Sequence, residues 1–151
     1  YTICWTTPRL KTTRAHQMAM SVVVYSPLQF LFWYDKPEQV EDAPELEFFN
    51  DLPVTWDETR VLADAVGDYA VVARRSGAQW YLGAITNERP RTVELRLGML
   101  PPGAPFTLRT FCDGAAKTVV AVSETAIKGG EPLTLSMAGS GGCAAIVEPL
   151  R

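Results

Sequence analysis

The stretch Thr55-Trp56-Asp57-Glu58-Thr59-Arg60-Val61-Leu62 divides the sequence into two parts with different hydrophobic periods. Before it, apolar residues recur at helical spacing and in one short continuous run. After it, strand-length apolar runs are separated by clusters of Gly, Pro, Asn and Ser. A period near 3.6 is typical of helices, and a period of two is typical of strands with one solvated face. The break therefore predicts two joined architectures, over residues 1–62 and 63–151.

The first part predicts a helix, a strand and a second helix. Apolar residues from Ala15 to Val23 lie at i, i+3, i+4, i+7 and i+8, after the candidate N-caps Thr12 and Thr13. Residues 28–34 form an aromatic, nearly continuous run, which favours a strand buried on both faces of a parallel sheet. Residues 45–52 predict a short helix. One such unit cannot cover both faces of its strand, so we expect it to be the end of a (β/α)8 barrel or doubly wound sheet in a larger protein.

The second part predicts an antiparallel β-sandwich. Turn signals such as Ser76-Gly77, Pro101-Pro102-Gly103 and Asp113-Gly114 separate short runs that alternate or are apolar. We expect seven strands, over residues 69–74, 80–87, 92–97, 106–112, 117–123, 133–137 and 143–148. The predicted fold is therefore mainly β, an antiparallel sandwich preceded by a helix–strand–helix remnant of a barrel.

Composition excludes several partners and sites. The net charge is −3, with acidic and basic residues interspersed, so no basic face is expected to bind nucleic acid. No apolar run approaches the roughly 20 residues of a membrane span, so no membrane partner is expected. Cys4, Cys112 and Cys143 are odd in number and widely spaced, so we expect small buried hydrophobes and neither a disulfide framework nor a metal site.

Trp33, Tyr34 and Asp35 are candidate substrate-binding residues because they follow the predicted strand. The C-terminal ends of barrel strands face the active site, where aromatic rings can stack on a sugar and a carboxylate can bind a hydroxyl. The alternative is that Trp33 and Tyr34 pack beneath the following loop.

Trp56, Asp57, Glu58 and Arg60 are expected at the interface between the two parts. Paired carboxylates next to an aromatic ring are also typical of glycosidases. Catalytic carboxylates, however, flank the sugar about 5–9.5 Å apart, and side chains of neighbouring residues diverge. We therefore expect Asp57 or Glu58 to pair with Arg60, and Trp56 to seal the joint.

His16 is the only histidine, which excludes ligation of a metal by several histidines. No nucleophile or second base lies at a spacing that would complete a catalytic site with it. We therefore expect a structural or supporting role for His16.

An ordered series of motifs runs along nearly the whole chain. It comprises Thr12-Thr13-Arg14-Ala15-His16-Gln17, Ser26-Pro27-Leu28-Gln29, Phe32-Trp33-Tyr34-Asp35-Lys36-Pro37, Glu45-Leu46-Glu47-Phe48-Phe49, Pro53-Val54-Thr55-Trp56-Asp57-Glu58-Thr59-Arg60-Val61-Leu62, Trp80-Tyr81-Leu82-Gly83-Ala84-Ile85-Thr86-Asn87 and Gly141-Gly142-Cys143-Ala144-Ala145. Together they resemble glycoside hydrolase family 97.

The resemblance implies a parent with an N-terminal β-sandwich, a central (β/α)8 barrel and a C-terminal β module that serves oligomerisation. It implies hydrolysis of α-glucosidic or α-galactosidic bonds, with inversion or retention, and calcium near the catalytic carboxylates. The family's catalytic and calcium-binding residues lie before the position that matches Tyr1. We therefore expect no catalytic or metal-binding residue here and no activity of the chain alone. The expected partners are the rest of the parent, a second copy and the parent's carbohydrate substrate, in the periplasm or outside the cell.

Two alternatives stay open from the residues alone. The chain could be a non-catalytic module that binds carbohydrate through Trp80, Tyr81 or Trp33, or a purely structural domain. The barrel remnant favours the enzyme fragment, because a free-standing sugar-binding module has no use for a single α/β unit.

Overall fold

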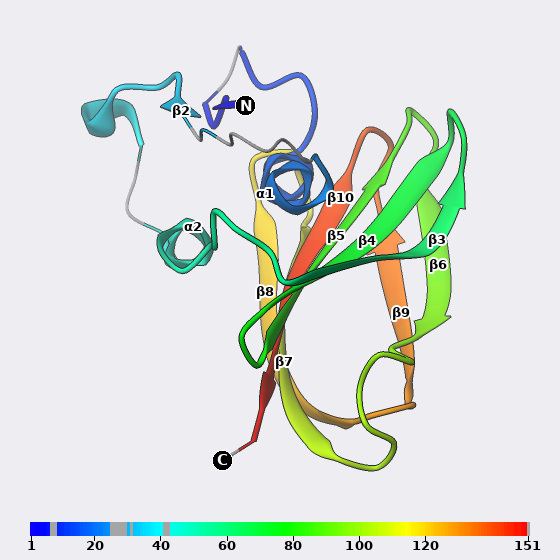
Figure 1. Cartoon of the computed structure of the whole chain (residues 1–151). Coiled ribbons are helices and arrows are strands. Elements are labelled where there is room, and N and C mark those ends of the chain that lie inside the picture. The colour runs from blue at the N-terminus through cyan, green and yellow to red at the C-terminus, as the bar shows by residue number, and fades with distance from the viewer. Residues whose placement is uncertain (7–8, 25–29, 31, 41–42, 151) are drawn as a thin grey trace.

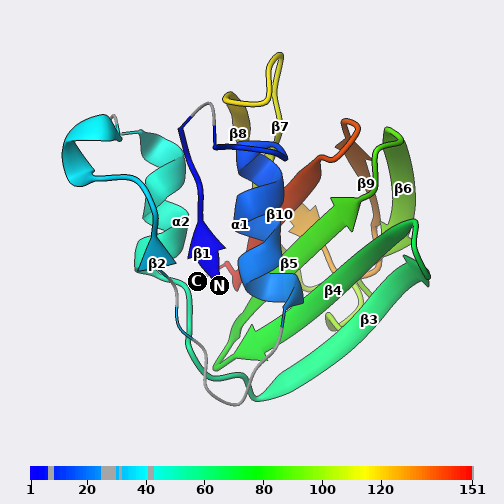
Figure 2. The same ribbon diagram turned by 90° about the horizontal axis from the view of Figure 1, so that it is seen from above.

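The computed structural model describes residues 1–6, 9–24, 30, 32–40 and 43–150 of the chain. A six-stranded antiparallel sheet faces a two-stranded sheet, and the helix α1 (Arg14–Val23) covers the other face of the larger sheet (Figure 1). A small parallel pair, β1 (Thr2–Ile3) with β2 (Phe32–Trp33), lies beyond α1 (Figure 2). The predicted fold class, mainly β with an N-terminal α/β piece, is confirmed.

The β module contains strands that follow one another by hairpins or longer loops. They are β3 (Glu58–Ala65), β4 (Tyr69–Ser76), β5 (Gln79–Thr86), β6 (Arg91–Arg96), β7 (Pro105–Asp113), β8 (Val120–Lys128), β9 (Pro132–Met137) and β10 (Gly142–Pro149). The order in the larger sheet is β3-β4-β5-β10-β7-β8, and β6 pairs with β9 in the smaller one. The β4–β5 turn places Gly77 at φ 58°, a left-handed backbone that glycine adopts without steric cost.

Burial explains why some strands alternate and others do not. β6 alternates between exposed and buried residues because one of its faces meets water. The central strands β5 and β10 are buried almost throughout, since β6 and β9 lie on one side and α1 on the other. Their sequences therefore read as continuous apolar runs.

Two hydrophobic clusters hold the layers together. One fills the space between the two sheets and includes Trp80, Leu82, Val93 and Leu135. The other lies between the larger sheet and the N-terminal part, and its buried members are Ile3, Trp5, Met18, Val22, Phe48, Tyr81, Phe111, Ala144 and Ile146. The larger sheet thus contributes to both cores, and the N-terminal part forms a layer over it.

The helices largely follow the sequence prediction. Thr13 caps α1 by accepting the His16 amide at 3.0 Å, and Ala15, Met18, Ala19 and Val22 are buried on the face that meets the sheet. The helix predicted over residues 45–52 consists of the 3₁₀ turn η2 (Pro44–Leu46) and α2 (Glu47–Asn50). A further 3₁₀ turn, η1 (Pro37–Gln39), precedes it.

The strand predicted over residues 28–34 differs from the prediction. Within the described residues only Phe32 and Trp33 form strand structure, and positions 28, 29 and 31 lie outside them. Phe30, Phe32 and Tyr34 are each more than half exposed, as expected for a unit that cannot cover both faces of its strand by itself. The physical reason is that the described chain supplies β2 with β1 as its strand partner and with no cover for its outer face.

Two strands of the module also differ from expectation. β3 was not predicted, because this edge strand has charged residues and only partly buried apolar ones. β8 begins at Val120 and not at residue 117, and it continues to Lys128. Its exposed second half carries no apolar alternation that could mark it as a strand.

Cys112 and Cys143 form a disulfide bond, so the expectation of isolated buried cysteines is wrong for this pair. They lie directly opposite each other in the register of β7 and β10. Their separation of 31 residues gives no sign of this, because only the strand order brings them together. Cys4 is free and partly buried.

Candidate functional site

The joint between α1 and the larger sheet is built around Arg74, a cation with only 3% of its surface exposed. Its Nε donates to the carbonyl oxygen of Val22 at 2.5 Å, and Nη2 donates to that of Val23 at 3.2 Å. Nη1 donates to the Thr59 hydroxyl at 3.1 Å. The last carbonyls of a helix lack partners within the helix and carry partial negative charge. Arg74 therefore caps the C-terminus of α1 from within the sheet.

Two glycines bring α1 into direct contact with the sheet backbone. A Cβ atom at Gly83 would lie 2.5 Å from the carbonyl oxygen of Ala19, and one at Gly142 would lie 2.7 Å from the Cα of His16. Any larger residue at either position would have to displace the helix. The helix α1 is therefore held against the β module near both of its ends.

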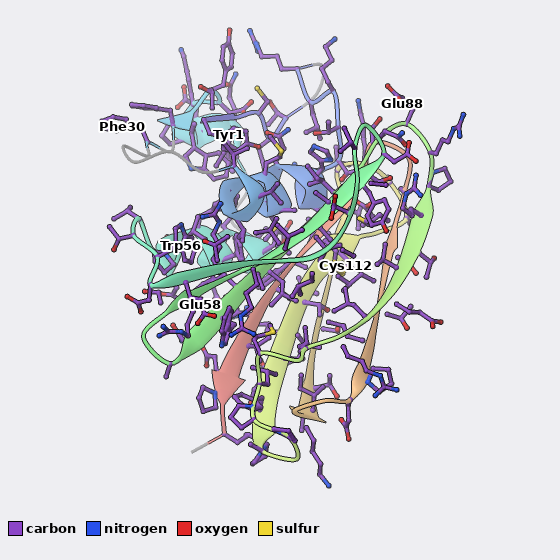
Figure 3. All side chains as sticks on the ribbon, turned by 45° about the vertical axis from the view of Figure 1, so that its right-hand side comes forward. Tyr1, Phe30, Trp56, Glu58, Glu88 and Cys112 are labelled. Atoms are coloured by element: carbon purple, nitrogen blue, oxygen red, sulfur yellow. A yellow bond between two sulfur atoms is a disulfide. The ribbon has the colours of Figure 1, made fainter. Side chains whose placement is uncertain are left out.

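Trp56 lies at the edge of this joint (Figure 3). Its ring meets that of Tyr81 edge-on, with centroids 5.4 Å apart, and the Arg74 guanidinium lies 5.9 Å from the Trp56 ring. The Tyr81 hydroxyl donates to the carbonyl oxygen of Asp51 at 3.0 Å. Trp56 and Tyr81 thus connect the segment after α2 to the sheet.

Asp57 and Glu58 bind the β4–β5 hairpin. Glu58 accepts hydrogen bonds from Arg60 Nε at 2.6 Å and from Arg75 Nε at 3.3 Å. The pKa of Glu58 is lowered, and the bond from Arg60 is the main cause. Asp57 Oδ2 accepts the Gly77 amide at 2.8 Å and Arg75 Nη1 at 3.3 Å. Both carboxylates share Arg75, so their observed contacts are with the β4–β5 hairpin.

Asp35 ties together the chain segments that leave β1 and β2. It is 5% exposed, its Oδ2 accepts the Trp5 amide at 2.7 Å, and its Oδ1 accepts the Thr6 hydroxyl. Burial by itself would raise the pKa of Asp35, but the hydrogen bonds from Thr6 and Trp5 outweigh it and hold that pKa below the usual value. Asp35 is therefore ionised at neutral pH, with both oxygens already hydrogen-bonded.

Trp33 and Tyr34 differ in what they present to solvent. Trp33 packs edge-on against Trp5 and Phe49, with centroids 5.5 and 5.2 Å apart, and it borders a pocket of about 320 Å³ with Phe49. Tyr34 is 54% exposed, and the Arg9 guanidinium lies 4.5 Å from its ring centroid. Of the two aromatic residues among the predicted substrate-binding residues, Tyr34 is the more exposed, and Arg9 lies over its ring.

Trp80 and Tyr81 are 5% and 1% exposed, one in each hydrophobic cluster. A buried ring cannot stack on a sugar, so the alternative that these two residues bind carbohydrate is wrong.

His16 lies at the start of α1, above the last turn before β10. Its Nδ1 donates to the carbonyl oxygen of Gly141 at 2.9 Å. Burial lowers the pKa of His16, against the opposing effects of this bond and of the Asp113 charge. Asp113 holds the same turn by accepting the amides of Ala138 at 2.7 Å and Gly142 at 2.9 Å.

Sequence reasoning missed Arg74, Gly83 and Asp113. The available signal for a buried cation was that Arg74 directly follows the apolar run Val71-Val72-Ala73 in β4. Within the described part of the chain, no group of three His, Cys, Asp or Glu side chains could hold a metal ion. In the same residues, no helix is long and apolar enough to cross a membrane.

Comparison with known proteins gives consistent matches. A family model described as "Glycosyl-hydrolase 97 C-terminal, oligomerisation" matches residues 55–148. The retaining alpha-galactosidase of Bacteroides thetaiotaomicron is 38% identical over 101 residues, covering 66% of this chain and 15% of that protein. The probable retaining alpha-galactosidase of Streptomyces bingchenggensis is 33% identical over 135 residues, covering 87% of this chain and 20% of that protein.

A solved structure agrees in fold over almost the whole chain. The glycoside hydrolase family 97 enzyme from Pseudoalteromonas sp. strain K8, in complex with acarbose, superposes with a TM-score of 0.82 at 34% identity. The match covers 93% of this chain and 23% of that one. The chain thus spans about a fifth of the length of the relatives it matches.

Proposed function

This chain belongs to glycoside hydrolase family 97, and we propose that it is the C-terminal portion of an enzyme that hydrolyses α-galactosidic bonds with retention of configuration. The support is that the relatives from Bacteroides thetaiotaomicron and Streptomyces bingchenggensis are named as retaining α-galactosidases, the second of them as probable. The second candidate substrate is an α-glucoside, which the resemblance implies equally. Carboxylate separation decides between retention and inversion, and those carboxylates belong to the rest of the parent.

We propose that this chain holds the end of the barrel against the β module. The observation that carries this role is the capping of α1 by Arg74, together with the close approach of α1 to Gly83. A helix fixed in this way orients β1 and β2, whose C-terminal ends lie on the face where barrels bind substrate. Tyr34 lies at that face and is the residue here that we propose contacts the sugar.

Calcium and location are proposals for the parent. The proposal for calcium follows from the family resemblance, which puts the ion near the catalytic carboxylates. We propose that any calcium is held by the rest of the parent, where the resemblance puts those carboxylates. The Cys112–Cys143 disulfide supports a periplasmic or extracellular location, since disulfides persist in oxidising compartments.

The proposed activity is tested on the parent polypeptide, with the complete barrel upstream of this chain. We expect release of p-nitrophenol from the aryl α-galactoside, and NMR of the first product should show the α-anomer. Activity confined to the aryl α-glucoside would favour the second candidate. Absence of activity on both substrates would overturn the proposal.

A further inference from the structure

The larger sheet ends at β8, a nine-residue strand with a free outer edge. Among the described residues β8 pairs with β7 alone. Residues 121–126 are exposed one after another, so side chains on both faces of the strand meet solvent. The unpaired amide and carbonyl groups of such an edge are a template for another strand.

The opposite edge of the same sheet is protected, and β8 is not. β3 contains a register shift between Val61 and Ala63, and it carries the charged residues Glu58, Arg60 and Asp64. Bulges and charges are the usual devices that prevent pairing between sheet edges. The structure therefore protects one edge against pairing and leaves the other available.

The residues of β8 suit pairing with another strand. Val122 is 40% exposed, and it is followed by Ser123 and Thr125. The charged residues within β8 are Glu124 and Lys128. In the smaller sheet both strands have six residues; β6 carries Arg91, Glu94 and Arg96, and β9 starts at a proline. β8 is thus the longest edge with the least protection (Figure 1).

We propose that β8 pairs edge-to-edge and antiparallel with β8 of a second copy, so that the two six-stranded sheets become continuous across a two-fold axis. A second copy is the expected occupant because the family model that matches residues 55–148 is described as an oligomerisation domain. A symmetric contact uses both β8 edges at once, whereas pairing β8 with a different strand would leave one edge open for further growth.

Charge and symmetry limit the register of this pairing. A two-fold axis perpendicular to the sheet pairs residues that point to the same face, so one residue lies opposite its own counterpart. Glu124 at that position would place two like charges together, which destabilises cross-strand pairs. Ser123 or Thr125 at the axis avoids the conflict and keeps most of β8 paired, over residues 120–126 or 122–128.

Sedimentation of the 151-residue chain at micromolar concentration tests the contact. We expect a mass of about twice 16.6 kDa. Ser123→Lys and Thr125→Lys should each raise the dissociation constant at least tenfold, because a lysine on the edge opposes pairing and neither position faces Glu124 of the second copy in either register. The matched control is Val61→Lys on the opposite edge, which should leave the mass unchanged. Equal melting temperatures of the three variants would exclude unfolding as the cause.

Cross-linking tests the geometry of the pairing. In a Cys4→Ser background, Ser123→Cys or Thr125→Cys should form a covalent dimer on oxidation, while Ser136→Cys on β9 should not. A dimer that survives both lysine variants but dissociates with Trp33→Asp would overturn the inference and assign the contact to the barrel remnant. A monomer at all concentrations would also overturn it. Neither result affects the activity expected of the parent, so the proposed function is tested separately.

Discussion

Arg74 of β4 donates to the carbonyl oxygen of Val22 at 2.5 Å, and this bond joins two parts of the chain that differ in architecture. Val22 and Val23 are the last two residues of α1. The guanidinium supplies partners to carbonyls that the helix itself cannot satisfy. Its own burial is compensated by these bonds and by Thr59.

Replacing Arg74 by methionine should therefore lower the free energy of unfolding by about 2–4 kcal/mol, because buried carbonyls lose a charged donor. Urea denaturation measures the change. Arg75→Met is the matched control, since Arg75 is partly exposed and its ion pairs lie at the surface. We expect that control to cost about 1 kcal/mol or less. Equal effects of the two substitutions would contradict the capping role.

Gly83→Ala should destabilise the chain by about 1–3 kcal/mol, the usual cost of overpacking. The new Cβ would lie 2.5 Å from the Ala19 carbonyl oxygen and 2.9 Å from Val23 Cγ2. Gly98→Ala is the control, because nothing lies within 4 Å of a Cβ at that position. Thermal unfolding of the two variants measures the difference. A neutral Gly83→Ala would show that α1 does not rest directly on β5.

The Cys112–Cys143 bond should be visible in a count of free thiols. The unfolded, unreduced chain should react at Cys4 alone, and the reduced chain at all three cysteines. Closing a loop of 31 residues stabilises a protein by roughly 3–4 kcal/mol on the chain-entropy model. Reduction should lower the melting temperature accordingly, and Cys4→Ser should not. Three reactive thiols without reductant would refute the bond.

Periodicity predicted the parts of this fold that are governed by local burial. The stripe from Ala15 to Val22 specified α1, and alternation specified β6, because each depends on one face meeting solvent. The edge strand β3 was missed, and β8 was predicted only over its first part, since exposed strands carry little apolar pattern.

The joint between α1 and the larger sheet could not be predicted from local patterns, because it depends on contacts between residues far apart in the sequence. Arg74 meets Val22 52 residues away, and Cys112 meets Cys143 only through strand order. Asp35 was placed correctly after a strand, but its hydrogen bonds to Trp5 and Thr6 depend on β1, which is two residues long and has no pattern of its own.

Stability should fall as the pH is lowered through the range where His16 gains a proton. Burial lowers the pKa of His16 below its ordinary 6.5, so the unfolded chain binds the proton more readily than the folded chain. The contribution of neutral His16 to stability is therefore complete above pH 6.5, and it is lost as the pH falls from 6.5 towards the lower pKa of the folded chain. Asp35 and Glu58, whose pKa values are also lowered, lose their contributions only at more acidic pH.

Urea midpoints at pH 7.5 and 5.5 measure this dependence. We expect a lower midpoint at pH 5.5 in the natural chain and a smaller difference in His16→Asn, whose amide can still donate to the Gly141 carbonyl. The same difference in both proteins would assign the pH dependence to other groups.

The 151-residue chain alone should not hydrolyse aryl α-galactosides or α-glucosides. Asp57 and Glu58 resemble a catalytic pair because they are two neighbouring carboxylates. Both of them, however, form ion pairs with Arg75, and Asp57 also accepts a hydrogen bond from the Gly77 amide. A general acid needs a raised pKa, whereas the bond from Arg60 lowers the pKa of Glu58. Release of p-nitrophenol measures turnover, with the barrel-containing parent as positive control. Turnover by the chain that Asp57→Asn or Glu58→Gln abolishes would show that these carboxylates are catalytic and not part of the joint.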